Sequence, residues 1–330
     1  MASKYMLSLA ILALLCACAV PFVQAEVVIP TDMVGQIEAI TAKSYNLYPV
    51  DQVKTETLYA NIDRWAQSQI TLDDASQAKS PRSSRLTWVK VASQNTPILA
   101  GDNKGEGLVL SGPFRIKYVK KSLGRALVKF LRVPTKKSLK KERVAELARQ
   151  FIQQQGFVAQ TQRDKLGRHL VVNRLSRSDL KGEGKSGPKL TILQRAVMKR
   201  QLDGLEVLNS KLVVDLHPDS MEVLAFKHLY WAPADEASGK HMPSISRDEA
   251  VAAIQQAFGQ SNRKVQVTAV KAGMYQTTDS IVPVLAVQVQ RVSEDQAAAT
   301  WPKVLLVPLV KDVSLPGREG VREYPSANAQ

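Results

Sequence analysis

One stretch of the sequence, Arg195 to Leu216, limits the possible folds more than any other because its pattern is that of a β-hairpin. Apolar and polar residues alternate on both sides of Asp203-Gly204, a dipeptide that favours a tight two-residue turn. Val197 precedes this turn, and the apolar residues Val207, Leu212, Val214 and Leu216 follow it. Such alternation predicts two antiparallel strands that share one buried face.

Two longer segments show the same order of elements: a helix that begins at a serine, a glycine that ends it, and then several strands. The first helix begins at Ser138 and ends at Gly156. The second begins at Ser246, where Glu249 completes a capping box, and the two serines lie 108 residues apart. We therefore predict an α+β fold with repeated modules of one helix packed on an antiparallel sheet, preceded by an N-terminal α+β region.

The predicted boundaries follow from changes in composition along the chain. Apolar residues at helical spacing predict two short helices near residues 33–40 and 58–65, inside an N-terminal region 26–133 that closes before Pro134. The two helix-plus-sheet modules then span 134–236 and 244–313. Residues 314–330 are polar and contain several Gly and Pro residues, so they predict a flexible tail.

The first 25 residues have the three parts of a secretory signal peptide. Lys4 precedes a short apolar core, and Val23-Gln24-Ala25 places small residues at the cleavage site, which makes Glu26 the expected mature N-terminus. We therefore expect an exported protein, periplasmic or secreted, without a transmembrane span in its mature chain. The alternative is a lipoprotein anchored at Cys18. Both cysteines, Cys16 and Cys18, lie in this segment, so the mature chain offers no disulfide or thiolate.

The net charge of +15 is concentrated in one part of the chain. Between Arg115 and Arg149 there are 13 basic residues and only two acidic ones. This asymmetry indicates either a solvated basic face or a surface for an anionic partner, such as an envelope polymer, lipid headgroups or an acidic protein. Nucleic acid is not an expected partner of an exported protein. The candidate residues for binding an anionic partner are Lys117, Lys120, Lys121, Arg125, Lys129, Arg132, Lys136, Lys137, Lys140 and Lys141.

Two local structures are open for the middle of this basic segment. A hairpin with a basic outer face fits the alternation of residues 114–118 and the glycine at Gly124. A basic amphipathic helix from Leu123 to Leu131 would instead indicate binding to a membrane surface. The hairpin is the favoured interpretation, because the apolar residues do not form a single helical stripe.

The sequence contains no catalytic, cofactor or metal motif that fits its context. There is no HExxH, no GxSxG, and no close pairing of the four histidines, and His217 and His228 are expected on a sheet face. Residues 182–187 match GxGxxG literally. However, Pro188 and a predicted strand follow, so no helix N-terminus would face a phosphate. We therefore predict a protein without cofactor that is not an enzyme.

The hairpin also carries a resemblance to a known family. The run KRQLDGLEVLNS from Lys199, followed by LVVDL, resembles the fungalysin/thermolysin propeptide motif. The helix from Ser246 and the strand Ile281 to Val292 similarly resemble the neighbouring PepSY domain, so that the resemblance covers about Ser138 to Val313. It implies a cystatin-like helix-on-sheet fold. In that family these domains precede a zinc metalloprotease, assist its folding and block its cleft, whereas the present sequence contains neither a protease domain nor a zinc motif.

Two hypotheses for function follow. The resemblance implies a non-catalytic exported module that binds a protein, with a secreted peptidase as the partner that it modulates or inhibits. The basic segment instead implies a protein that binds an anionic envelope surface. Under either hypothesis Lys199, Gln201 and Asn209 of the hairpin are expected to be exposed, and to support the fold or make contacts rather than perform chemistry.

Overall fold

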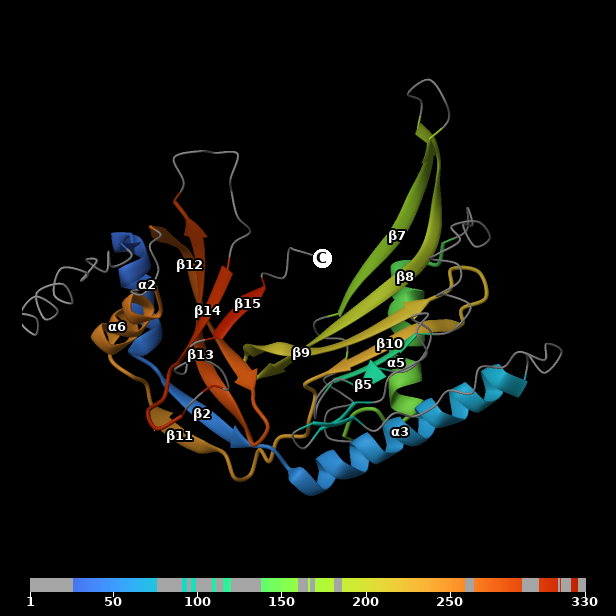
Figure 1. Cartoon of the computed structure of the whole chain (residues 1–330), viewed down its shortest axis with the longest axis horizontal. Coiled ribbons are helices and arrows are strands. Elements are labelled where there is room, and N and C mark those ends of the chain that lie inside the picture. Colours follow the sequence, from blue (N-terminus) through green and yellow to red (C-terminus); the bar gives the residue numbers. More distant parts are fainter. Residues whose placement is uncertain are drawn as a thin grey trace, which may run out of the picture. The chain divides into compact units, whose positions relative to one another are not determined.

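The computed structural model describes residues 26–75, 91–93, 96–98, 109–110, 115–119, 138–159, 166, 170–180, 186–258, 264–292, 303–313, 315 and 322–325. The predicted signal peptide, twelve of the seventeen residues of the predicted tail and the basic segment 120–137 lie outside these residues. Within the tail, residues 322–325 form a strand paired with residues 303–306, so the prediction of a flexible tail is wrong at these residues. The chain divides into two compact units, and Figure 1 labels most of their elements. The first unit contains residues 1–45, 243–272 and 284–330, and the second contains 46–242 and 273–283.

The second unit is built on one antiparallel sheet. Its strands follow the spatial order β7-β8-β9-β10-β6-β5, and every neighbouring pair is antiparallel. The bounds are β5 Val109–Leu110, β6 Arg115–Val119, β7 Leu170–Leu180, β8 Ser186–Leu202, β9 Leu205–Leu216 and β10 Val223–Leu229. A separate two-stranded sheet consists of β3 Val91–Ser93 and β4 Thr96–Ile98.

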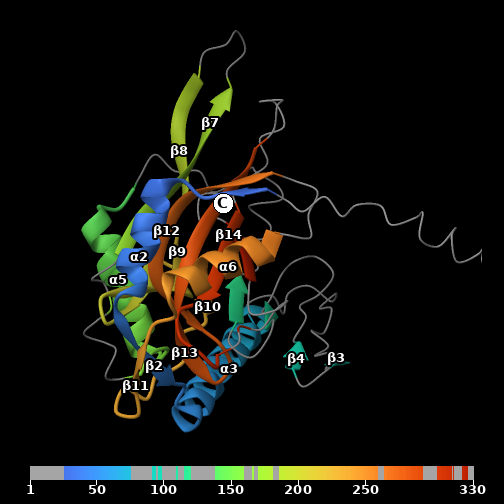
Figure 2. The same ribbon diagram turned by 90° about the vertical axis from the view of Figure 1, so that its left-hand side faces the viewer.

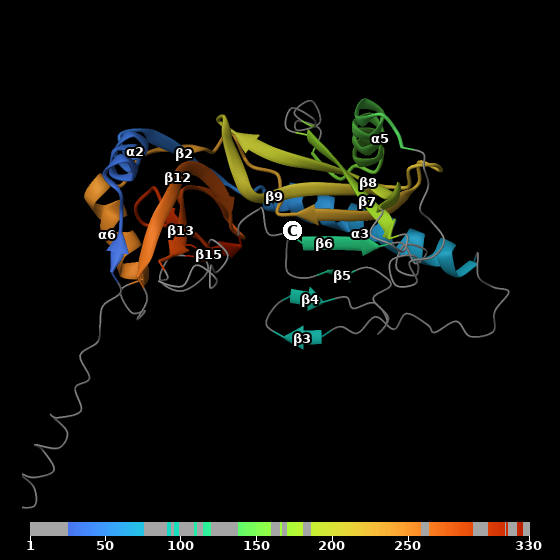
Figure 3. The same ribbon diagram turned by 90° about the horizontal axis from the view of Figure 1, so that it is seen from above.

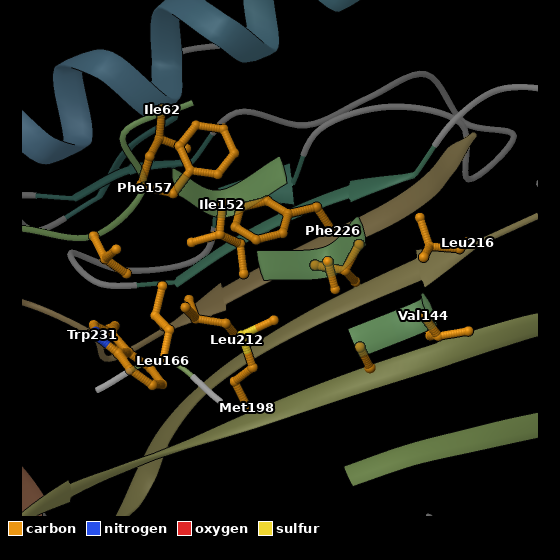
Figure 4. Close-up of a cluster of buried hydrophobic side chains, with 14 of the residues drawn as sticks. Ile62, Val144, Ile152, Phe157, Leu166, Met198, Leu212, Leu216, Phe226 and Trp231 are labelled. Atoms are coloured by element: carbon orange, nitrogen blue, oxygen red, sulfur yellow. The ribbon is translucent and has the colours of Figure 1, made fainter. Parts of the chain in front are cut away.

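Two helices complete the second unit, α3 Gln52–Ala75 and α5 Lys141–Gln154. The buried face of α5 consists of Val144, Ala148 and Ile152, which recur every four residues and therefore form one stripe. Figure 4 shows Ile152 beside Phe226 of β10 and Phe157 beside Ile62 of α3. Gly156 has a φ of +67°, the left-handed conformation that commonly ends a helix, as the sequence predicted.

A second apolar cluster surrounds the turn of the central hairpin, where the ends of two further strands enter the second unit. These strands are β12 Val265–Gln276 and β13 Ser280–Arg291, which contribute residues 273–283 to it. Met274 of β12 pairs with Val207 of β9 in parallel, and Ile281 of β13 pairs with Tyr48 of β2 (Ser44–Pro49). The buried members of this cluster are Tyr48, Val50, Leu202, Val207, Ala232, Met274 and Ile281.

The first unit packs two helices, α2 Thr31–Thr41 and α6 Arg247–Phe258, which lie side by side in Figure 3. Its strands are β1 Val27–Val28, β14 Lys303–Pro308 and β15 Arg322–Pro325, with the remaining parts of β12 and β13. β1 pairs with β12 in parallel, and β13, β14 and β15 are antiparallel neighbours. A short strand, β11 Lys240–Pro243, joins the second unit to the first.

The predicted capping box of α6 is confirmed atom by atom. The Ser246 hydroxyl accepts a hydrogen bond from the Glu249 N–H at 3.2 Å, and the Glu249 carboxylate accepts one from the Ser246 N–H at 2.7 Å. These contacts satisfy two backbone donors that the helix itself leaves unpaired. Together with the Lys311 ammonium 3.0 Å away, they lower the pKa of Glu249 to about 2.

The predicted α+β class is confirmed, and so is a helix packed on an antiparallel sheet after Ser138. Two details differ from the prediction. The first helix begins at Lys141 rather than at Ser138, and the N-terminal residues 26–45 cluster with the C-terminal segments through the β1–β12 pair. Such a pairing joins residues more than 200 positions apart, so no local pattern reveals it. None of the described helices combines the length and apolarity needed to cross a bilayer.

Candidate functional site

The central hairpin forms as predicted, and its turn is held by side chains from elsewhere in the second unit. Asp203 and Gly204 have φ values of +50° and +76°, the two left-handed residues of a type I′ turn. The Tyr48 hydroxyl donates a hydrogen bond to Asp203 Oδ2 at 2.6 Å, and Asn46 Nδ2 donates to the same oxygen at 2.9 Å. Burial, reinforced by the Asp203 bond, raises the pKa of Tyr48 to about 12. Tyr48 is therefore an un-ionised donor at neutral pH.

The position of Tyr48 depends on a close approach of the backbone at Gly239. A Cβ atom added at Gly239 would lie 2.7 Å from Tyr48 Cε1 and 2.9 Å from Cδ1, inside van der Waals contact. We expect Gly239→Ala to displace the Tyr48 ring and to lower the free energy of unfolding by about 1–3 kcal/mol. Urea denaturation measures this change.

Gly35→Ala provides the control of opposite sign. Gly35 lies within α2, and a Cβ atom there meets nothing within 4 Å. Replacement of a helical glycine by alanine should therefore raise the free energy of unfolding by up to about 1 kcal/mol. If both substitutions raised the free energy of unfolding, the position of the Tyr48 ring would not depend on the absence of a side chain at Gly239.

The strands of the hairpin are irregular near their turn. Gln201 pairs with Glu206, but Lys199 pairs with Lys211, so Arg200 of β8 lies opposite residues 207–210 of β9. Because of this shift, the side chains of β8 that precede the irregularity lie on the opposite face of the sheet from the face that simple alternation predicts. Val197 pairs with Val213, and therefore the prediction that Val197 shares a face with Leu212 is wrong. The irregularity lies where β9 changes its neighbour from β10 to β12.

A buried polar network fills this irregular part of the sheet. Arg200 Nη1 donates to the Ala232 carbonyl at 2.8 Å and to Gln276 Oε1 at 3.1 Å. The same Gln276 oxygen accepts from the Ala232 N–H at 3.1 Å. Arg200 and Gln276 are almost completely buried, with 3% and 0% of their surfaces exposed. The two side chains thus satisfy the N–H and the carbonyl of Ala232, a buried residue that lies outside the strands.

Asn209 extends the β-ladder with its side chain. Its Nδ2 donates to the Gln276 carbonyl at 2.8 Å, while its Oδ1 accepts from the Gln276 N–H at 3.0 Å. Next to it, the Ser210 hydroxyl donates to the Tyr230 carbonyl. Asn209 is 3% exposed, so the prediction that it is exposed is wrong, whereas Lys199 is exposed and forms an ion pair with Glu206 at 2.8 Å. The amide is buried because it replaces a missing strand partner.

Arg200 is a buried cation without a paired carboxylate in the described part of the chain. Burial lowers its pKa to about 10, and the charge of Glu236 opposes this shift from a longer range. Arg200 Nη2 and Gln276 Nε2 are also buried donors without a partner among the described residues. Such groups reduce stability. Nothing in the sequence pattern marked Arg200, because a basic residue in an alternating strand normally faces solvent.

A buried histidine and tyrosine lie in the adjoining core. Tyr59 Oη and His228 Nδ1 are 3.3 Å apart, and the two rings meet edge to face. Burial lowers the pKa of His228 to about 3 and raises that of Tyr59 far above its ordinary value. Both groups are therefore neutral at physiological pH, and His228 has no exposed surface. This pair is suited to packing rather than to proton transfer.

The alternation of β10 already pointed to this environment. Phe226 and His228 are two residues apart on β10, so they share a face, and Phe226 belongs to the core. His228 therefore lies on a sheet face, as expected, but this face is buried rather than exposed. His217, by contrast, stands in the turn after β9, where its Nδ1 accepts from the Ser220 N–H at 3.0 Å.

The structure places three of the ten predicted anion-binding residues. Lys117 lies on β6, and Lys140 and Lys141 are exposed at the start of α5. The other candidates, Lys120, Lys121, Arg125, Lys129, Arg132, Lys136 and Lys137, lie outside the described residues. The choice between a hairpin and a helix for this basic segment therefore stays a prediction.

The start of α5 has an unusual distribution of charge. Its N-cap is Lys140, which provides no side-chain cap, and Lys141 occupies the first turn. Positive side chains are unfavourable here because the helix dipole is positive at this end. The segment is held instead by Gln194 of β8, whose amide exchanges hydrogen bonds of 2.7 and 2.9 Å with the backbone of Leu139.

Among the described residues, no group of three or more His, Cys, Asp or Glu side chains could hold a metal ion. No protein-family model matches this chain, and no curated protein matches its sequence. One similar solved structure is the C-terminal domain of YpeB from Bacillus megaterium, with 10% identity over 66% of this chain and 76% of that chain, at a TM-score of 0.25. A likeness of this degree carries no information about function.

Proposed function

We propose that this protein is an exported, non-catalytic module that binds a protein partner, and that the partner is a secreted peptidase. The observation that carries the proposal is that the side chains of the propeptide-like motif in the central hairpin make hydrogen bonds within the fold. Asp203 binds Tyr48, Asn209 binds Gln276 and Ser210 binds Tyr230, so the motif side chains serve the fold. The propeptide resemblance of this hairpin supplies the class of partner.

The partner can be tested by affinity capture. The mature full-length protein is immobilised and exposed to the envelope and secreted fractions of its source, with an equally basic protein as the control for charge-driven retention. We expect a peptidase to be retained selectively, and its hydrolysis of a peptide substrate to fall at least tenfold when the protein saturates it. Retention of no peptidase, or an unchanged hydrolysis rate, would contradict the proposal.

Export can be tested independently by mass spectrometry of the protein from the secreted or periplasmic fraction. We expect the mature chain to begin at Glu26, since Val23-Gln24-Ala25 has the small residues of a signal-peptidase site. A chain that begins at a lipid-modified Cys18 would show that the protein is an anchored lipoprotein instead. A chain that retains Met1 would contradict export by cleavage.

A second candidate function is binding to an anionic envelope surface, and the start of α5 favours it. Lys140 and Lys141 lie at the positive end of a helix without a side-chain cap, where they reduce stability. A residue that reduces stability but serves binding is a common compromise at functional sites. Charge reversal at these positions should therefore have opposite effects on stability and on binding.

We expect Lys140→Glu/Lys141→Glu to raise the free energy of unfolding by about 0.5–1 kcal/mol, because acidic residues in the first turn complement the dipole. The same variant should bind vesicles that contain phosphatidylglycerol about tenfold more weakly, as measured by co-sedimentation at low salt. Lys43→Glu/Lys240→Glu is the control, with the same change of net charge at other exposed lysines. A stability gain with unchanged vesicle binding would indicate a solvated basic face only.

A further inference from the structure

Strand β7 forms one edge of the sheet in the second unit. Its residues Leu170–Leu180 pair with β8, and no other described strand pairs with it. Figures 1 and 2 show that the β7–β8 hairpin extends beyond β9 and β10. At eleven residues, β7 is longer than the usual edge strand of a soluble protein, which is kept short to prevent pairing with other chains.

The first half of β7 is a regular and firmly anchored strand. Residues 170–175 pair with β8 without a break, and the irregularities begin only between Leu175 and Ser176. Leu170 and Val172 pack against the main apolar cluster of the second unit, while Val171 and Asn173 are exposed on the opposite face. Such a strand presents a fixed edge rather than a fluctuating one.

The backbone of this half-strand offers hydrogen-bonding groups at its free edge. In an antiparallel pair, every second residue directs its N–H and C=O away from the partner strand. Soluble proteins usually block such groups with charged side chains, proline or a bulge. The sequence LVVNRL of residues 170–175 has no proline and a single charged residue, Arg174, and the register irregularities lie beyond it.

We propose that residues 170–175 of β7 are a docking edge, on which an extended acidic segment of the partner protein adds as a further strand. The occupant follows from charge. The hairpin, residues 170–202, contains eight basic and two acidic residues. Arg200 is buried, and Arg195 and Lys199 form ion pairs with Asp215 and Glu206, which leaves five basic residues against two acidic ones. Two copies of this edge therefore repel each other, whereas an acidic segment is attracted. Main-chain pairing supplies affinity and alternate side chains supply specificity. This inference rests on the proposed function, because it names how the protein partner binds.

A synthetic probe tests the edge directly. The probe is an eight-residue peptide of alternating valine and glutamate with blocked termini, and the control is the same peptide with lysine in place of glutamate. Hydrogen exchange of the full-length protein is followed by NMR. With the glutamate peptide, we expect at least tenfold slower exchange at alternate amides of residues 170–175, and no change with the lysine peptide.

Two substitutions at one exposed position separate binding from folding. Val171 is 47% exposed, and Val171→Glu and Val171→Lys remove the same side chain while adding opposite charges. We expect Val171→Glu to weaken the binding of the glutamate peptide at least tenfold, and Val171→Lys to retain it. Val292→Glu is the matched control, since Val292 is 42% exposed and belongs to the first unit.

Three results would overturn the proposal: peptide binding without protection of residues 170–175, equal binding by Val171→Glu and the unchanged protein, or concentration-dependent dimerisation that protects β7 without peptide. Capture from the secreted fraction distinguishes this failure from failure of the proposed function. If the unchanged protein and Val171→Glu retain the peptidase equally, the partner stands and the edge is wrong. If neither retains a peptidase, the proposed function itself is contradicted.

Discussion

Asn209→Ala is expected to lower the free energy of unfolding by about 3 kcal/mol. Alanine removes both hydrogen bonds between the Asn209 amide and the Gln276 backbone, at 2.8 and 3.0 Å. The N–H and C=O of Gln276 then stay buried without partners, and each such group costs about 1–3 kcal/mol. Urea denaturation followed by circular dichroism measures the change.

Asn173→Ala is the matched control for this experiment, because Asn173 is an exposed asparagine on β7 of the same unit. Its replacement should change the free energy of unfolding by less than about 0.5 kcal/mol, as is usual for surface positions. Equal effects of the two substitutions would show that Asn209 does not replace a strand partner.

Acidification from pH 7 to pH 5 is expected to lower the free energy of unfolding by about 2 kcal/mol through His228 alone. Burial lowers the pKa of His228 to about 3; the backbone of Phe157 opposes the shift, and the charge of Arg200 adds to it. An unfolded histidine has a pKa near 6.5, so the unfolded state binds more protons between these two values. The stability is therefore complete above about pH 6.5 and is lost as the pH falls toward 3.

The range from pH 7 to pH 5 separates His228 from the acidic groups. The pKa values of Asp51, Asp235 and Glu249 are lowered in the folded protein, so their contributions are lost only as the pH falls below the ordinary carboxylate range. His228→Gln removes the titrating group and keeps a polar side chain opposite Tyr59. We expect this variant to lose most of the stability change between pH 7 and pH 5. An unchanged pH dependence would assign the effect to other groups.

Local patterns predicted those features that neighbouring residues determine by themselves. The Asp203-Gly204 turn, the capping box of Ser246 and the glycine at the end of α5 all have the expected geometry. Each lies within fewer than ten consecutive residues, whose own backbone preferences and hydrogen bonds favour the observed geometry. At the Asp203-Gly204 turn, Tyr48 and Asn46 add tertiary hydrogen bonds to this local preference.

The polar interior could not be predicted, because its causes lie far apart in the sequence. Asn209 is buried since Gln276, 67 residues later, brings beside it a backbone N–H and carbonyl that the single β9–β12 pair, Met274 with Val207, does not reach. Arg200 is buried because the neighbour of β9 changes from β10 to β12 at this point. The register of β8 against β9 shifts there, and this shift turns the Arg200 side chain inward. Only His228 had a usable signal, the two-residue spacing from Phe226.

The path of the chain has a consequence for the order in which the protein can fold. The polypeptide passes between the two units four times, and residues 273–283 complete a unit whose other residues end at 242. During synthesis, Asn209 and Arg200 therefore lack their hydrogen-bonding partner Gln276 until the last fifth of the chain has begun to emerge. A chain truncated after residue 242 would contain nearly the whole second unit in sequence but would lack residues 273–283. It would therefore leave β9 without its β12 neighbour, and Arg200 and Asn209 without Gln276. Exposed strands and polar groups of this kind lead to aggregation.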